Sequence, residues 1–502
     1  MAERRVTFLI FVTLTLAYAF VFPRWLDWNA NARFDLSAAI VDQGTLSIDA
    51  YAPNTGDYAL FNGHRYIDKA PGLSFLGVPV YFVVSRVTQL EVVQNLIVSL
   101  GRAPAAASTI NRSSDQVSRA ELIFASRIAL TTWLIVGLSS ALLGVVLFYF
   151  LGRLNYPLRW RAFAVLIYGV ATPAFTYSAA FYGHQVAAVL LFGAFAWLVA
   201  LRSRRARSIE WFVIGGLLGY AVVTEYPAVL IAACIGLYAI WITRRVPPII
   251  LIALGGFIPI GLWGAYNASI FGTPFALGYQ YTANPYWSAI LSTGFLSANV
   301  PTLEAIWGLT FSPFRGLFFA SPILLLSLPG LVLLRRSIFR AEWVTTLASV
   351  LGFFVLISAS AQWWGGWSAG PRYLVPMLPF LVWPLTATLD RMARLTTKWR
   401  VGLGLITIGL AVISIVNGWS LTLGGQYYAP DNIMNPLIEY SWPHLSTGDV
   451  ARNWGMLIGL PGAASVLPLI LLISGAAGLI WIITRINREP QDVKADQALD
   501  AH

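Results

Sequence analysis

Acidic side chains with neighbouring cations are concentrated in one polar stretch near the start of this 502-residue chain. Eight of the 22 acidic residues lie between residues 24 and 118, and cations adjoin them at Arg33/Asp35 and at Asp68-Lys69. A carboxylate can deprotonate a hydroxyl group, and lysine and arginine bind phosphate oxygens through charge-assisted hydrogen bonds. The combination indicates chemistry on a phosphate-bearing substrate. A solvated loop without a function is the alternative.

The elements that position this stretch are apolar runs of about 20 residues, long enough to cross roughly 30 Å of hydrocarbon. Only 11% of the residues are charged, against roughly 25% in a soluble globular protein. We predict an all-α polytopic membrane protein with about 12 transmembrane helices. They lie near residues 6–23, 121–151, 161–182, 185–201, 211–226, 228–243, 248–266, 317–334, 342–360, 373–389, 401–420 and 463–484.

Basic residues form clusters between these runs, as orientation signals do. With the N-terminus in the cytoplasm, the cytoplasmic segments contain 21 of the 33 basic residues, including Arg488 and Lys494. The pattern predicts a multi-pass plasma (inner) membrane protein with both termini in the cytoplasm. It also accounts for the net charge of +11, so nucleic acid is not an expected partner.

Two short helices are expected within the polar stretch. Its apolar residues recur at helical spacing at Phe34, Leu36, Ala39 and Ile40. We therefore expect an amphipathic helix on the outer membrane surface, with Asp35 on its polar face and Gly44 as its stop. The apolar run 73–84 is too short for a span and contains a proline, which predicts a helix dipping into the interface.

Asp68-Lys69-Ala70-Pro71 resembles the acidic-Lys-Pro element of the GT-C superfamily, with Ala70 inserted before the proline. These polytopic glycosyltransferases use polyprenyl-phosphate sugars, and they include the lipid A aminoarabinose transferases and the protein O-mannosyltransferases. The resemblance covers about residues 5–390 and is greatest to the phospholipid-carrier-dependent glycosyltransferases. Similar motifs follow at Phe181-Tyr182-Gly183-His184, Thr224-Glu225-Tyr226-Pro227, Tyr266-Asn267 and Gly365–Pro379.

The resemblance divides the chain into three parts. A GT-C-like transmembrane catalytic module covers residues 1–390 and includes the extracytoplasmic loop 24–118 with its juxtamembrane helices. Further transmembrane helices occupy 391–489, with an extracytoplasmic loop at 421–462. Residues 490–502 form a cytoplasmic tail.

One motif of the family is altered here. The family places an Asp-Glu pair three residues before an arginine, whereas Asn29-Ala30-Asn31-Ala32-Arg33 contains no acid. Asp35 is the favoured catalytic carboxylate, because it lies beside Arg33 on the expected surface helix. Asp57 and Asp68 are the alternatives, and Asp27, a lone acid at a helix end, is a weaker one.

Other candidates come from the outer ends of spans. Arg33, Lys69 and Arg372 are expected to bind the phosphate of a donor, although Arg372 could instead extend to the membrane surface. His184 and Glu225 are candidate substrate contacts, with an ordinary interfacial role as the alternative for each. A metal contact of Glu225 is also open, so the resemblance requires no certain cofactor but leaves a divalent cation possible.

The resemblance implies transfer of a sugar from a polyprenyl-phosphate carrier to an acceptor hydroxyl on the extracytoplasmic face, with inversion at the anomeric carbon. The acceptor is a glycan, a lipid or a protein, and the enzyme is a hexosyl- or pentosyltransferase. The alternatives are a twelve-span secondary transporter and a protein that binds or flips a lipid-linked substrate. A transporter requires ionisable or broken-helix sites near the bilayer midplane.

Overall fold

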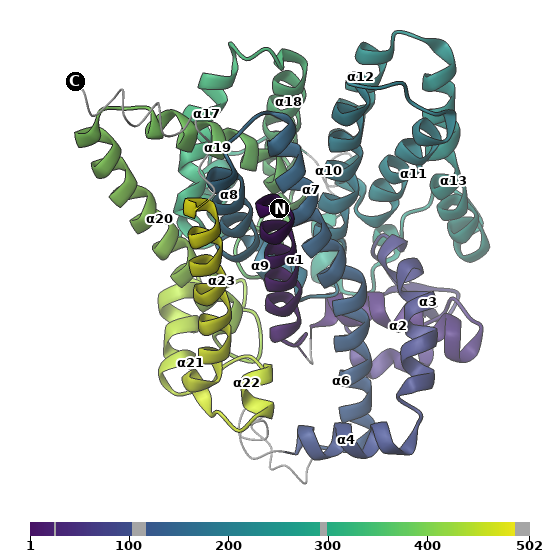
Figure 1. The fold of residues 1–502 in the computed structure, drawn as a ribbon. Coiled ribbons are helices and arrows are strands. Elements are labelled where there is room, and N and C mark those ends of the chain that lie inside the picture. The colour runs from purple at the N-terminus through teal and green to yellow at the C-terminus, as the bar shows by residue number, and fades with distance from the viewer. Residues whose placement is uncertain (25–26, 103–116, 292–298, 487–502) are drawn as a thin grey trace.

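Helices form nearly all of the regular structure of the protein (Figure 1). The computed structural model describes residues 1–24, 27–102, 117–291 and 299–486. Within this part, the sheet is a single antiparallel hairpin of β1 (Ala59–Phe61) and β2 (His64–Tyr66). The predicted all-α class is therefore confirmed. Asp115, Arg488, Lys494 and the predicted tail 490–502 lie outside the described residues.

Eight helical segments of the described chain are long and apolar enough to cross a membrane. They are Arg119–Arg153, Gly183–Leu201 (α10), Tyr226–Thr243, Val246–Phe271 (α13), Arg340–Ser358 (α18), Arg372–Ala393, Thr397–Leu423 (α20) and Gly462–Ile486. Shorter apolar helices, such as α11 (Ser208–Thr224), accompany them. The polytopic prediction is confirmed, and the number of 12 spans stays a prediction.

Proline divides two of the predicted spans. The expected span 161–182 consists of α8 (Leu158–Val170) and α9 (Pro173–Ser178). The expected span 317–334 is broken at Pro322, between α16 (Leu317–Ala320) and α17 (Ser327–Leu334). Proline has no amide hydrogen with which to continue a preceding helix. The helix α10 follows α9, with Tyr182 as its N-cap and His184 in its first turn.

The helix α2 (Trp28–Gln43) is packed inside the protein. Residues 29–39 are all buried. The helix α3 (Gly72–Val87) covers it so closely that a Cβ atom on Gly77 would lie 2.2 Å from the Ser37 hydroxyl. The expectation of an amphipathic surface helix is therefore wrong. The predicted stop is confirmed, because Gly44 follows α2 in the left-handed conformation with φ +67°.

The connections between α12 (Val229–Thr243) and α13 and between α17 and α18, which contain clusters of basic residues, lie at the top of Figure 1, and this end of the helix bundle is called the basic end below. There Arg161 pairs with Glu3 at 2.5 Å, and Arg202 pairs with Glu342. The helices α2, α3 and α4 (Glu91–Gly101) lie toward the opposite end. A common location of the clusters is what the predicted topology requires. Which end faces the cytoplasm stays a prediction.

The chain beyond α20 folds back toward the end of α1 (Ala2–Phe20). Val21 forms a bridge with Asn453, and the Phe22 amide donates to the Arg452 carbonyl at 2.9 Å. Residues from both predicted parts, 1–390 and 391–489, therefore build the end of the protein opposite the basic end.

Candidate functional site

A cavity of about 360 Å³ lies where the segment after α1, the loop around β1 and β2, the start of α10 and the segment after α20 meet. Charged side chains from widely separated segments line it. The cations are Arg24, Arg33, Lys69 and Arg372, and the carboxylates are Asp27, Asp57 and Glu225. Six of the eight predicted site residues, all but Asp35 and Asp68, are among the residues that line the cavity.

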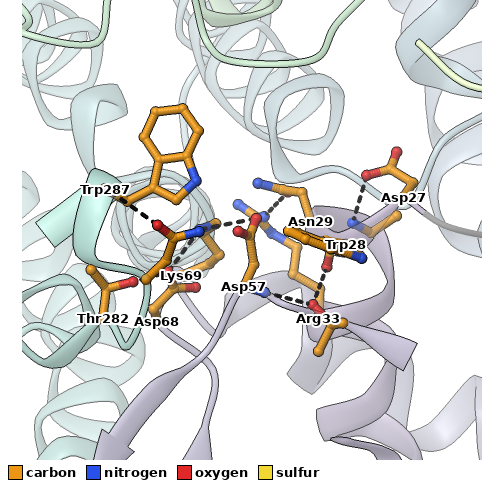
Figure 2. A network of polar contacts seen from close by, with 12 residues as sticks. Asp27, Trp28, Asn29, Arg33, Asp57, Asp68, Lys69, Thr282 and Trp287 are labelled. Atoms are coloured by element: carbon orange, nitrogen blue, oxygen red, sulfur yellow. Dashed lines mark hydrogen bonds and ion pairs between the residues drawn. The ribbon is translucent and has the colours of Figure 1, made fainter. Parts of the chain in front are cut away.

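Lys69 lies between two carboxylates (Figure 2). Its Nζ atom is 2.9 Å from Asp68 Oδ2 and 3.5 Å from Asp57 Oδ2. Asp68 does not line the cavity and is 1% exposed. It also accepts a hydrogen bond from Thr282 Oγ1 at 3.0 Å. Burial alone would lower the pKa of Lys69, but the charges of Asp57 and Asp68 outweigh it and raise that pKa. Lys69 is therefore a cation held in place by two anions.

Glu225 joins two other predicted residues. It follows the last residue of α11, and its Oε1 atom is 2.8 Å from Arg33 Nη2 and 3.3 Å from His184 Nδ1. Arg33 also donates to the side-chain oxygen of Asn29, one turn earlier on α2. The charge of Arg33 is thus compensated, and its geometry is restrained from two sides.

Arg372 has the opposite character. Its side chain is buried, yet it forms no ion pair with any carboxylate of the described residues, and its Nε atom has no hydrogen-bond partner among them. Its other nitrogens donate to the hydroxyls of Tyr182 and Tyr373 at 3.3 and 3.4 Å. Burying a cation is costly unless an anion compensates it. Arg372 is therefore a buried cation of the cavity whose charge no carboxylate of the described residues compensates.

The backbone next to Arg372 explains the paired glycines of the Gly365–Pro379 motif. Gly365 has a φ of +76°, and a Cβ atom there would lie 2.9 Å from Arg372 Nε. Only glycine meets both conditions without strain. The glycine motif thus forms the surface against which the guanidinium packs.

Asp27 is a site residue to which the sequence gives little weight. It caps α2 by accepting from the Ala30 amide at 3.3 Å, and it also accepts from the Tyr182 hydroxyl at 2.8 Å. Burial raises the pKa of Asp27, and the Tyr182 hydrogen bond offsets part of this effect. An acidic residue just before a segment with apolar residues at helical spacing is typical of a helix N-cap. This pattern in the sequence could have indicated where Asp27 lies.

The sequence motifs did not indicate Arg24 or most of the aromatic lining, although Tyr182, Trp367 and Tyr373 lie within them. Arg24 donates to the Thr422 carbonyl at 2.7 Å, and its guanidinium lies 4.0 Å from the centre of the Tyr428 ring. The other aromatic residues of the lining are Trp28, Tyr182, Tyr279, Trp287, Trp367, Tyr373 and Tyr427. They come from segments that no local pattern connects. Aromatic rings beside polar groups are typical of pockets for organic ligands.

Asp35, the favoured carboxylate of the sequence, is in a different place from the one expected. It is 0% exposed, accepts a hydrogen bond from Asn54 at 3.1 Å, and is not among the residues that line the cavity. Burial raises the pKa of Asp35 well above its ordinary value. The expected position on an exposed polar face is wrong, because α2 is enclosed on this side too.

A metal site was left open by the sequence. Among the described residues, no three or more His, Cys, Asp or Glu side chains are grouped so that they could hold a metal ion. The carboxylates of the cavity are instead paired with cations or with hydroxyl groups.

No protein-family model and no curated protein sequence matches the chain. Two solved structures share its overall course, the crystal structures of ArnT from Cupriavidus metallidurans in the apo state and bound to undecaprenyl phosphate. Both are 14% identical to this chain. The apo structure matches 94% of this chain and 72% of its own with a TM-score of 0.48, and the second matches 97% and 75% with a TM-score of 0.49. The similarity is therefore one of the backbone path, not of the sequence.

Proposed function

We propose that the protein is a glycosyltransferase that takes a sugar from a polyprenyl-phosphate carrier and transfers it to an acceptor hydroxyl. The observation that carries this proposal is Arg372, a buried cation without a carboxylate partner among the described residues, facing a cavity with carboxylates and aromatic rings. A phosphodiester satisfies the cation, and the rings suit a sugar. The motifs that resemble the GT-C superfamily supply the class of carrier.

The proposed reaction is a direct displacement at the anomeric carbon. A carboxylate takes the proton of the acceptor hydroxyl while its oxygen attacks the anomeric carbon of the donor sugar. The bond from that carbon to the phosphate oxygen breaks, and the electron pair leaves with the polyprenyl phosphate. Charge therefore grows on the phosphate, and nearby cations stabilise the transition state more than the ground state. The configuration of the anomeric carbon is inverted.

Asp57 is the carboxylate that we assign as the base. Of the three acids predicted for this role, it is the one that lines the cavity. The polar contact of its carboxylate within the described chain is the 3.5 Å ion pair with Lys69, so an oxygen remains for an acceptor proton. Neither Asp68, whose Oδ2 atom contacts Lys69 and Thr282, nor Asp35 lines the cavity.

The remaining predicted residues bind the leaving phosphate or position the substrate. Arg372 and Lys69 hold the leaving phosphate, one from each of two separate segments. Glu225 fixes Arg33 and His184, so these three residues shape the wall against which a substrate lies. The positive-inside pattern supports an extracytoplasmic position of the cavity in the inner membrane, because the cavity lies away from the basic end.

A secondary transporter stays the alternative from another class. It requires ionisable or broken-helix sites near the bilayer midplane. Asp27, Lys69 and Glu225 lie in loops or next to helix ends instead, and Arg33 lies within the short helix α2. This distribution supports an enzyme at the membrane surface.

The test separates binding from chemistry. Purified Asp57→Asn is expected to lose about 10²–10⁴-fold in the rate of sugar transfer, the usual contribution of a general base, and to keep its affinity for a polyprenyl-phosphate sugar. Arg372→Gln is expected to bind that donor about ten- to a hundredfold more weakly, as for a charge-assisted hydrogen bond of roughly 1.5–3 kcal/mol. Turnover and donor binding are measured on a panel of synthetic polyprenyl-phosphate sugars.

Two variants serve as matched controls. Asp35→Asn removes a carboxylate outside the cavity, and Arg65→Gln removes a cation of the β-hairpin that does not line it. Both are expected to keep transfer and donor binding. Normal transfer by Asp57→Asn together with an inactive Asp27→Asn would assign the base to Asp27. Unchanged donor affinity of Arg372→Gln would contradict the proposed phosphate contact.

A further inference from the structure

The wall of the cavity beside Arg372 is formed in part by residues 364–370, which belong to no helix or strand. Gly365, Gly366 and Trp367 of this segment line the cavity. Gly365 and Gly366 have φ values of +76° and +65°, which glycine adopts without strain. Because glycine adopts many other conformations as readily, the backbone of the segment does not fix its own shape. Side chains from elsewhere must hold it.

The buried side chain of Arg315 joins two carbonyls of this segment. Its Nε atom donates to the Trp364 carbonyl at 3.1 Å, and its Nη2 atom donates to the Gly366 carbonyl at 2.8 Å. Arg315 is 0% exposed. The two carbonyls belong to the residues on either side of Gly365. Arg315 therefore fixes the backbone before and after the glycine that packs against Arg372.

The guanidinium group is suited to this role. Its N–H groups form a rigid planar fork that binds two carbonyls at once, whereas a lysine ammonium is a compact charge on a flexible chain. The Nη1 atom of Arg315 also donates to the Phe314 carbonyl at 2.9 Å, and the guanidinium lies 4.0 Å from the centre of the Phe314 ring. Burial lowers the pKa of Arg315 to about 10, and the charge of Arg372 acts in the same direction, against Tyr177 and Asp431. Arg315 is thus still a cation at pH 7, and it is near enough to Arg372 for their charges to interact.

We infer that Arg315 is a positioning residue of the donor site. It holds residues 364–366 in the shape that places Gly365 against the Arg372 guanidinium, and it so keeps that guanidinium where the donor phosphate binds. Arg315 is not among the described residues that line the cavity, so it acts through Arg372 and not by contact with the substrate. The inference rests on the phosphate contact of Arg372 proposed above.

Two substitutions separate the fork of Arg315 from its charge. Arg315→Gln removes both, and Arg315→Lys keeps the charge but does not join the two carbonyls. Both are expected to weaken binding of a synthetic polyprenyl phosphate, the carrier without its sugar, about tenfold. This loss is smaller than the roughly hundredfold that a 1 Å misplacement can cause. Binding is measured on the purified full-length protein, so the result does not depend on which sugar the enzyme transfers.

Arg161→Gln is the matched control. Arg161 is also buried, its Nε atom donates to the Phe148 carbonyl at 3.0 Å, and its guanidinium lies 4.0 Å from the Phe148 ring centre. It does not line the cavity and holds no residue of the segment 364–370. Arg161→Gln is expected to lower the melting temperature and to keep the affinity for polyprenyl phosphate.

A double-mutant cycle with Arg372→Gln distinguishes positioning from a general effect on the fold. If Arg315 acts through Arg372, Arg315→Gln weakens binding in the wild type but has little further effect in the Arg372→Gln background. A purely structural role would weaken binding by the same factor in both backgrounds. Thermal unfolding verifies that each variant is folded. Arg315→Lys decides if Arg315→Gln is not folded, and Phe314→Leu, which loosens the guanidinium without removing it, decides if neither is.

Three results would overturn the inference alone, provided that Arg372→Gln itself weakens binding. These are unchanged affinity of the folded Arg315 variants, equal losses in both backgrounds of the cycle, and full affinity of Arg315→Lys, which would assign the effect to charge. Unchanged affinity of Arg372→Gln would instead contradict the proposed phosphate contact, and the inference would fall with it.

Discussion

Charge compensation divides the four cations of the cavity into two kinds. Lys69 and Arg33 lie within 3 Å of a carboxylate, whereas Arg372 and Arg24 contact hydroxyls, a carbonyl and aromatic rings. A paired cation positions its neighbours and contributes little net charge. An uncompensated one attracts an anionic ligand. The two kinds therefore predict different effects of substitution.

Asp68 allows the paired kind to be tested. It is a positioning residue, since it holds Lys69 at 2.9 Å from outside the cavity lining. Asp68→Asn should leave Lys69 less restrained and raise KM for the donor about tenfold, with a smaller change in kcat. Steady-state kinetics at varied donor concentration measures the split. A loss confined to kcat would instead identify Asp68 as the base.

Asp35 predicts a pH dependence of stability. Burial raises the pKa of Asp35 in the folded state. The contribution of Asp35 to the stability of the folded protein is therefore fully present below its unfolded pKa of about 3.9. This contribution to stability is lost as pH rises through the higher pKa of the folded state. Asp35→Asn avoids the charge and can still accept the hydrogen bond from Asn54. It should be at least as stable as the wild type at pH 8, with no gain near pH 4, in thermal unfolding.

Asp49 is the control of opposite sign. Its partial burial would raise its pKa, but hydrogen bonds with Ser47, His64 and the Arg65 amide outweigh burial and lower the pKa. Its stabilising effect is present above the unfolded pKa and is lost as pH falls. Asp49→Asn should therefore lower the melting temperature at pH 8. A stabilised Asp49→Asn, or a destabilised Asp35→Asn at pH 8, would contradict this account.

At the scale of elements, close packing of α11 on α13 positions Glu225. A Cβ atom on Gly215 would lie 2.0 Å from the Ile252 carbonyl oxygen, and one on Gly255 would lie 1.9 Å from that of Phe212. Small residues let transmembrane helices approach in this way. Since Glu225 follows the last residue of α11, a displaced α11 would move its carboxylate away from Arg33.

Gly215→Leu is therefore expected to destabilise the protein by about 1–3 kcal/mol, as overpacking does, and to reduce transfer as well. Gly236→Leu is its matched control, because Gly236 also lies in a helix, but a Cβ atom on it would meet no atom within 4 Å. Unfolding in detergent and transfer assays compare the two. Equal stability of both variants would show that the α11–α13 contact is not tight.

For the whole molecule, the predicted orientation can be tested by cysteine labelling, because Cys234 is the one cysteine of the chain. In a Cys234→Ala background, Asn62→Cys and Glu439→Cys should react with an impermeant reagent applied from outside. Arg205→Cys and Thr397→Cys, at the basic end, should react only after permeabilisation. All four positions are exposed. Labelling of Arg205→Cys from outside would reverse the orientation and place the cavity in the cytoplasm.

The sequence by itself determined the all-helical polytopic class and the stop of α2 at Gly44. These features depend on local composition and on backbone preferences, which a short window of residues expresses fully. It also indicated six residues that line the cavity, because chemically distinctive residues stood out against an apolar background.

Only the tertiary structure decided which carboxylates face the cavity. Arg33 and Glu225 are 192 residues apart, Asp27 and Tyr182 are 155 apart, and Arg24 reaches Thr422 across 398 residues. Such contacts depend on how whole helices pack, which no local spacing encodes. Asp35 shows the consequence. Its neighbours in sequence suggested an exposed polar face, but long-range packing by α3 and the loop at Asn54 enclosed it.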